Sequence, residues 1–143
     1  MTGPGTGPGA DDAAEVLAAN RAFYAAVEAG DLDGIRAALV GHRDAVCVHP
    51  GAEPIHGTES VLRSWALILA NTPYLQFFLT DEEVSVHGDV AAVTLTENVL
   101  AAAEGAATDT FHGGRARALN VLCRTEAGWR VWIHQASPVG SEA

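Results

Sequence analysis

The chain has 143 residues, of which 48% are hydrophobic, and this is enough for a single compact domain with a buried core. Eighteen acidic residues outnumber the eight basic ones, which are all arginines, and the formal net charge is -10. This charge repels nucleic-acid phosphates and anionic lipid surfaces, so we expect neither nucleic acid nor a membrane as a partner. No apolar stretch is long enough to span a membrane and no signal-peptide pattern opens the chain, which predicts a cytoplasmic protein.

The first ten residues (1–10) are rich in Gly and Pro, which predicts a flexible tail before one domain at 11–140. A first helix is predicted next, because apolar residues recur at helical spacing, and Gly30 ends it. Asp31 or Asp33 is suited to cap a second, shorter helix.

Strand patterns begin with a short apolar run at 45–49, after which Thr58 is suited to cap a third helix. From residue 74 onward the hydrophobic period is two, as in β-strands, and an acidic interruption at 81–83 indicates a bulge. Strands are predicted at 74–86, 90–100 and 115–125, and a last strand runs from the turn around Gly128 to Pro138. A hairpin turn at 88–89 connects the first two strands, and a long loop at 101–114 connects the second and third.

Helices at the front of the chain and antiparallel strands at its back indicate an α+β fold. We expect a cone-shaped fold in which a curved mixed or antiparallel sheet wraps around three N-terminal helices. Such a cone can leave a cavity at its open end. Polar residues on its buried strands then mark either a satisfied internal network or the wall of a ligand cavity.

Several short motifs give the chain a resemblance to a known family. They are Asn20 to Tyr24 with Gly30-Asp31, Val48 to Gly51 with Gly57 and Ser64-Trp65, Glu97-Asn98, Asn120-Val121, Trp129-Arg130, and Ala136 to Pro138. In these residues the chain resembles the SnoaL-like (polyketide cyclase-like) branch of the nuclear transport factor 2-like superfamily. The resemblance implies the cone-shaped fold and a homodimer formed through the sheet face. Similar members usually carry two or three His before the Ala-Ser-Pro, whereas Ile133 and Gln135 flank a single His134 here.

Polar residues of the last two strands are candidates for binding a substrate. Residues two apart in a strand share a face, and the hairpin loop decides which residues lie opposite one another. A two-residue loop at 127–128 places Asn120 opposite Gln135, whereas a loop changed by one residue brings Asn120 to His134. Either arrangement offers hydrogen bonds to a carbonyl or hydroxyl of a ligand, or forms a mutually satisfied cross-strand pair.

Glu97 is the ionisable residue best suited to act as a catalytic base. Apolar residues share its strand face, and partial burial raises the pKa of a carboxyl group toward the range useful for proton transfer. The alternative is that Glu97 faces solvent or pairs with Arg117 or Arg124.

His49, Trp65 and Phe23 complete the predicted site. His49 ends a strand at a turn, where its imidazole is suited to carry protons at a cavity mouth or to make structural hydrogen bonds. Trp65 on the third helix and Phe23 on the first are suited to line an apolar substrate cavity or to fill the core.

No metal and no cofactor are expected, because the His and Glu residues lack compact ligand spacing and no nucleotide-binding motif is present. Two functions fit the sequence. The first is a pocket protein that binds a small, largely apolar molecule and isomerises, cyclises, dehydrates or hydrolyses it, with Glu97 or His49 as the catalytic proton carrier. The second is a non-catalytic ligand-binding or dimerisation domain.

Overall fold

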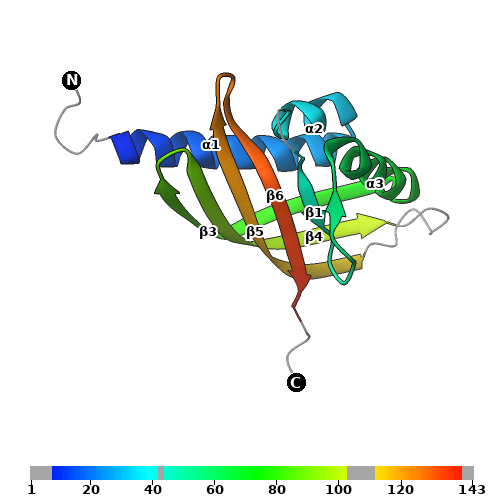
Figure 1. The fold of residues 1–143 in the computed structure, drawn as a ribbon. Helices are drawn as coiled ribbons and strands as arrows, with labels where there is room; N and C mark the ends of the chain where they lie inside the picture. Colours follow the sequence, from blue (N-terminus) through cyan, green and yellow to red (C-terminus); the bar gives the residue numbers. More distant parts are fainter. Residues whose placement is uncertain (1–7, 42–43, 103–111, 140–143) are drawn as a thin grey trace.

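The computed structural model describes residues 8–41, 44–102 and 112–139 of the chain (Figure 1). Its helices are α1 (Pro8–Ala29), α2 (Leu32–Ala38) and α3 (Thr58–Asn71). Its strands are β1 (Val46–Val48), β2 (Ile55–His56), β3 (Tyr74–His87), β4 (Val90–Ala102), β5 (His112–Thr125) and β6 (Gly128–Pro138). The predicted order of elements is confirmed, with the short strand β2 added between β1 and α3.

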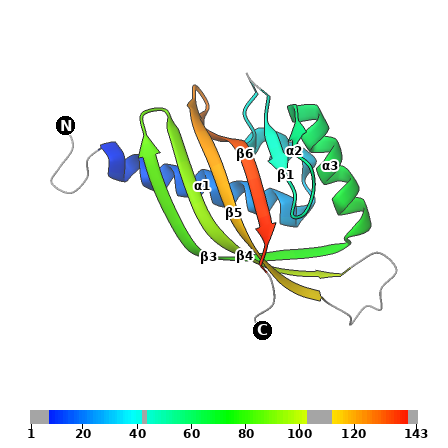
Figure 2. The same ribbon diagram turned by 60° about the horizontal axis from the view of Figure 1, so that its bottom comes forward.

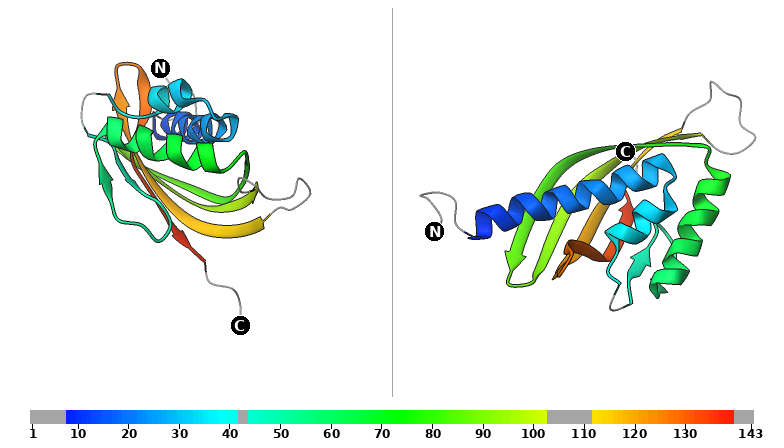
Figure 3. Two further views of the ribbon diagram at one scale, coloured as in Figure 1. Left: turned by 90° about the vertical axis from the view of Figure 1, so that its right-hand side faces the viewer. Right: turned by 90° about the horizontal axis from the view of Figure 1, so that it is seen from above.

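The strands form one curved sheet in the order β2-β1-β6-β5-β4-β3. Strand β1 pairs with β6 in parallel and the other neighbours pair antiparallel, so the sheet is mixed. The long strands β3 to β6 curve across α1, which lies behind them in Figure 2. Figure 3 shows the three helices together on one side of the curved sheet, which confirms the predicted cone-shaped α+β fold.

The first helix starts earlier than predicted. Helix α1 begins at Pro8, inside the segment predicted as a tail (1–10), and the rest of that segment lies outside the described residues. Of the two candidates for the cap of α2, Asp31 is the N-cap residue, and its side chain accepts a 2.9 Å hydrogen bond from the Gly34 amide.

The start of α3 also differs from the prediction. Its N-cap residue is Gly57 and not Thr58, and Gly57 has a φ of 101°, a conformation that favours glycine. The Thr58 hydroxyl instead donates a 3.3 Å hydrogen bond to the carbonyl of Val40.

The predicted bulge in β3 is confirmed. The pairing of β3 with β4 shifts register between Thr80 and Glu83, and Asp81 there has a positive φ of 59°. The Asp81 carboxylate accepts a 2.9 Å hydrogen bond from the Thr96 hydroxyl. The predicted loop at 101–114 is shorter in the structure, because β4 extends to Ala102 and β5 starts at His112; residues between them lie outside the described part.

The β5–β6 hairpin decides how the polar residues of these strands meet. The chain reverses at 126–127, one residue earlier than the two-residue loop considered above, and β6 contains a bulge at Trp132. Together they place Asn120 opposite His134. The arrangement with Asn120 opposite Gln135 is therefore wrong.

The core lies between the concave face of the sheet and the helices. Its fully buried apolar side chains include Val16, Phe23, Val27, Ile35, Val61, Val93, Leu122 and Val131. Cys47 and Cys123 are buried free thiols. Polar side chains are buried in the same layer, and most of them meet between α1 and the sheet.

Candidate functional site

The candidate site is a set of buried polar side chains between α1 and the sheet. It consists of Asn20 and Tyr24 of α1, Glu97 of β4, Asn120 of β5 and His134 of β6, which we call the buried polar cluster. None of these residues is more than 4% exposed. The structure thus brings together three of the predicted site residues from three different strands.

Tyr24 and Asn20 belong to the site but were not among the residues predicted for it. Asn20 stands on the helix face that Val16 and Phe23 also occupy, and all three are fully buried. A buried amide needs hydrogen-bond partners, so a lone Asn on an apolar helix face was the available signal.

Glu97 lies on the concave face of β4, opposite Leu79 of β3 and Ala116 of β5. The Tyr24 hydroxyl donates a hydrogen bond of 2.5 Å to Glu97 Oε2, a length typical of hydroxyl–carboxylate bonds. Burial raises the pKa of Glu97, and the bond from Tyr24 opposes this rise. The carboxyl group is therefore desolvated and held by one strong donor.

The alternative that Glu97 faces solvent or pairs with an arginine is wrong. Arg124 forms ion pairs with Asp12 at 2.8 Å and with Asp89 at 3.1 Å. Arg117 is exposed and lines a groove on the opposite face of the sheet.

Asn120 joins the helix to the strands. Its Nδ2 donates to Asn20 Oδ1 at 2.7 Å and to the Tyr24 hydroxyl oxygen at 3.2 Å. Its Oδ1 lies 2.6 Å from His134 Nδ1. The amide thus connects α1, β5 and β6 through polar atoms that water does not reach.

His134 is neutral in this environment. Burial, and then the positive charge that His49 can carry, lower the pKa of His134 to about 3. Its Nε2 lies 3.9 Å from Glu97 Oε2, which is too long for a direct hydrogen bond, and the neutral ring makes no ion pair.

Aromatic rings form the apolar wall beside the buried polar cluster. The ring centroids of Phe23 and Trp65 lie 5.1 Å and 5.9 Å from that of His134, and Phe23 and Trp65 pack edge to face. Trp65 is 5% exposed, and its buried Nε1 has no hydrogen-bond partner among the described residues. A buried indole N–H without a partner is a donor suited to a ligand oxygen.

His49 lies next to this wall and outside the buried polar cluster. Its ring packs edge to face with Trp65 at 4.7 Å, and its Nε2 lies 2.9 Å from Ser64 Oγ. Cys47 Sγ is 3.5 Å from the same nitrogen. Burial lowers the pKa of the half-buried His49, so the uncharged form predominates near neutral pH.

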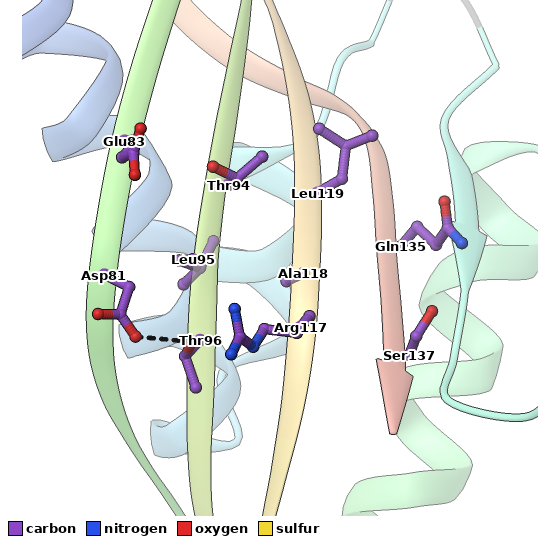
Figure 4. Close-up of a pocket in the computed structure, with 10 residues that line it drawn as sticks. All are labelled: Asp81, Glu83, Thr94, Leu95, Thr96, Arg117, Ala118, Leu119, Gln135 and Ser137. Carbon is purple, nitrogen blue, oxygen red and sulfur yellow. Dashed lines mark hydrogen bonds between the residues drawn. The ribbon is translucent and has the colours of Figure 1, made fainter. Parts of the chain in front are cut away.

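Gln135 does not belong to the interior. It is exposed on the opposite face of β6 from His134, so its predicted approach to Asn120 does not occur. Figure 4 views this outer face, with the helices behind the sheet. The groove there has a volume of about 310 Å³ and is lined by Asp81, Glu83, Thr94, Leu95, Thr96, Arg117, Ala118, Leu119, Gln135 and Ser137.

Neither a metal-binding cluster nor a membrane-spanning helix is present in the parts of the chain that the structure describes. They contain no group of three or more His, Cys, Asp or Glu side chains arranged to hold a metal ion. None of the helices seen there has the length and apolar character needed to cross a membrane.

Comparisons with known proteins place the chain in a family. A protein from Streptomyces avermitilis, described as a candidate dehydratase of the nuclear transport factor 2-like family, is 43% identical with a TM-score of 0.84, over 92% of this chain and 98% of that one. A candidate calcium/calmodulin-dependent protein kinase II association domain from Thiobacillus denitrificans is 31% identical with a TM-score of 0.66, over 87% and 94%. A candidate aromatic ring hydroxylase from Novosphingobium aromaticivorans shares the fold at 19% identity and a TM-score of 0.81, over 92% and 91%.

A search of curated proteins gave no match. The SnoaL-like domain family matches residues 16–141, which is nearly the whole of the described chain. The neighbours and this match agree with the fold, and the chain therefore belongs to the SnoaL-like domain family, within the nuclear transport factor 2-like superfamily.

Proposed function

We propose that the protein is an enzyme that converts a small, largely apolar molecule by general acid–base chemistry, with Glu97 as the catalytic base. The observation that carries this proposal is the position of the Glu97 carboxyl group. It is buried, receives one hydrogen bond from Tyr24, and lies 3.9 Å from the Nε2 atom of a neutral His134. A carboxylate whose pKa is raised by burial is a stronger base than an exposed one.

Dehydration is the reaction that we favour, because the relative with 43% identity is described as a candidate dehydratase. In this reaction Glu97 takes a proton from the carbon next to a carbonyl group, and the bond from the β-carbon to its hydroxyl group breaks. Glu97 then returns the proton to the departing hydroxide, which leaves as water. The product gains a carbon–carbon double bond, and the carboxylate is regenerated.

Substrate binding is assigned to the residues that surround this carboxyl group. Phe23 and Trp65 supply the apolar wall, and the Trp65 N–H is a donor for a carbonyl oxygen. His134 orients the polar end of the substrate, and Asn120 holds the His134 ring in place through Nδ1. His49 is the second candidate proton carrier, since it contacts Trp65 and stays largely uncharged. Gln135 has no support as a substrate ligand in the interior.

The proposal is tested by turnover of a panel of β-hydroxy ketones, followed by mass spectrometry for the loss of one water. Glu97→Gln keeps the size of the side chain and removes the base, so we expect turnover to fall by about 100-fold or more. Glu126→Gln makes the same change at an exposed turn residue and should keep wild-type turnover. Full activity of a folded Glu97→Gln variant rejects Glu97 as the base.

A non-catalytic binding or dimerisation domain is the second candidate. Phe23, Trp65 and the hydrogen-bonded amides occupy the interior, and a candidate association domain is 31% identical to this chain. Apolar Leu119 and Phe78 are exposed on the sheet, at 39% and 52%. Acidic Asp81 and Glu83 line the same groove as basic Arg117, which allows two copies to pair across a two-fold axis.

The remaining properties rest on the sequence. A small apolar ligand, a homodimer through the sheet face and a cytoplasmic location stay predictions. The same holds for the expectation of no cofactor, no metal, no nucleic acid and no membrane as partners.

A further inference from the structure

The hydrogen bonds of Asn120 fix the positions of the hydrogens that it shares with its neighbours in the buried polar cluster, whereas the buried Asn20 Nδ2 has no partner among the described residues. The Asn120 amide nitrogen has two hydrogens, and both are used, toward Asn20 Oδ1 and the Tyr24 oxygen. Asn120 Oδ1 can only accept, so His134 Nδ1, at 2.6 Å, carries the hydrogen of that bond. In a neutral imidazole the other nitrogen, Nε2, then carries a lone pair.

The carboxyl group of Glu97 also has a defined donor. Because the Tyr24 oxygen receives a hydrogen from Asn120, its own hydrogen points to Glu97 Oε2 at 2.5 Å. Glu97 Oε2 and His134 Nε2 therefore face each other across 3.9 Å as two acceptors. A hydroxyl group has one hydrogen, so it donates to one of these acceptors, and the lone pair on Nε2 is free to receive it.

We propose that Asn20 and Asn120 are positioning residues that hold His134 in its Nδ1–H form, and that His134 Nε2 accepts the hydrogen of a hydroxyl group on a ring-bearing substrate. This inference rests on the proposed function, because it names the substrate class of the same site.

Two independent observations support a ligand with this chemistry. The rings of Phe23 and Trp65 flank His134 and match a planar or cyclic compound. Trp65 Nε1 is a buried donor without a partner among the described residues, and it is suited to a second oxygen of the same ligand. The site therefore combines an acceptor for a hydroxyl hydrogen, His134 Nε2, with a donor for a carbonyl oxygen, Trp65 Nε1.

The positioning role is tested by ¹⁵N NMR of the imidazole nitrogens, which needs no substrate. In the wild-type protein we expect His134 to carry hydrogen on Nδ1 only and to remain neutral down to about pH 5. A hydrogen on Nε2 in the wild-type protein would overturn the proposal, and this readout is independent of any variant.

Asn120→Asp provides the second arm. A carboxylate that accepts from Nδ1–H stabilises the charged ring, so the pKa of His134 should rise. Asn98→Asp is the matched control, because Asn98 bonds to Phe78 and Thr80 and not to the buried polar cluster. An unchanged titration of His134 in a folded Asn120→Asp variant argues against the positioning role.

The hydroxyl site is tested with phenol and anisole, which share a ring and differ in the hydroxyl hydrogen. We expect phenol, and not anisole, to shift the Nε2 resonance of His134. No shift with phenol at its solubility limit, or equal shifts with both compounds, rejects the hydroxyl site. Failure of the proposed function would appear instead as full turnover by Glu97→Gln, so the two failures are distinguishable.

Discussion

Burial and hydrogen bonding act on Glu97 in opposite directions. Burial raises the pKa of its carboxyl group, whereas the hydrogen bond from Tyr24 lowers it. For Tyr24, burial and the nearby Glu97 both favour the neutral hydroxyl group, so both raise its pKa. The pair therefore keeps the proton on Tyr24 and the acceptor on Glu97.

Tyr24→Phe removes the hydroxyl group that donates to Glu97 and accepts from Asn120. We expect the pKa of Glu97 to rise further and the free energy of unfolding to fall by about 1–3 kcal/mol. Carboxyl ¹³C NMR and urea unfolding measure the two effects. Tyr74→Phe loses an exposed hydroxyl bond to Gln76 and should change stability by about 0.5 kcal/mol or less. An unchanged pKa of Glu97 in Tyr24→Phe would contradict this account.

His134 makes the stability depend on pH. The folded protein keeps its ring neutral down to a pKa of about 3, whereas in the unfolded chain the ring takes up a proton near the ordinary value of 6.5. Between these values the unfolded chain binds more protons, so stability falls as the pH falls. Glu97, whose folded pKa is raised, acts with the opposite sign.

We expect His134 to cost about 2 kcal/mol of unfolding free energy between about pH 6.5 and about pH 5. Urea unfolding at both pH values measures this loss. His134→Gln should lose less stability over the same interval, whereas His87→Gln, at an exposed position, should behave like the wild-type protein. Equal losses in wild-type and His134→Gln would show that other groups cause the effect.

The sequence predicted three members of the buried polar cluster and missed two. Glu97, Asn120 and His134 stand out because polar residues on apolar strands are rare. The helical pattern showed that Tyr24 and Asn20 lie near the buried face of α1. It did not show which strand residues they meet, because that depends on how the helix crosses the sheet.

At the scale of elements, periodicity predicted the long helices and strands, but not the details that set the register. The position of the turn and one bulge at Trp132 together bring Asn120 opposite His134, and an alternating pattern does not reveal where one extra residue is inserted. Strand β2 was missed because two residues, Ile55 and His56, are too few to show a period.

The N-cap of α2 gives a prediction at this scale. Asp31→Ala removes the acceptor for the Gly34 amide, and we expect it to lower the free energy of unfolding by about 1 kcal/mol. Asp31→Asn keeps a capping oxygen and should stay near the wild-type value. Thermal and urea unfolding compare the variants. Equal stability of Asp31→Ala and wild type would mean that this bond contributes nothing.

At the scale of the whole molecule, the two faces of the sheet differ in character. The concave face holds the core and the buried polar cluster, while the convex face carries the groove with Leu119 and Gln135 (Figure 4). The proposed homodimer would cover this exposed apolar surface and leave the interior site unchanged.

Leu119→Arg should therefore convert the proposed dimer into a monomer, because a charge at the centre of the interface has no room for its hydration shell. Sedimentation velocity measures the change. Leu67→Arg is the matched control, since Leu67 is 66% exposed on α3, away from the sheet. A monomeric wild-type protein would contradict the dimer.

Strand β6 is the last element in chain order, yet it lies between β5 and β1. It supplies His134, whose neighbours in the sheet are Asn120 on one side and Cys47 on the other. While the chain is being synthesised, the earlier elements can collapse, but the sheet stays divided until β6 inserts. The buried polar cluster is thus complete only once β6 has inserted, so a chain that lacks β6 should lack the proposed site.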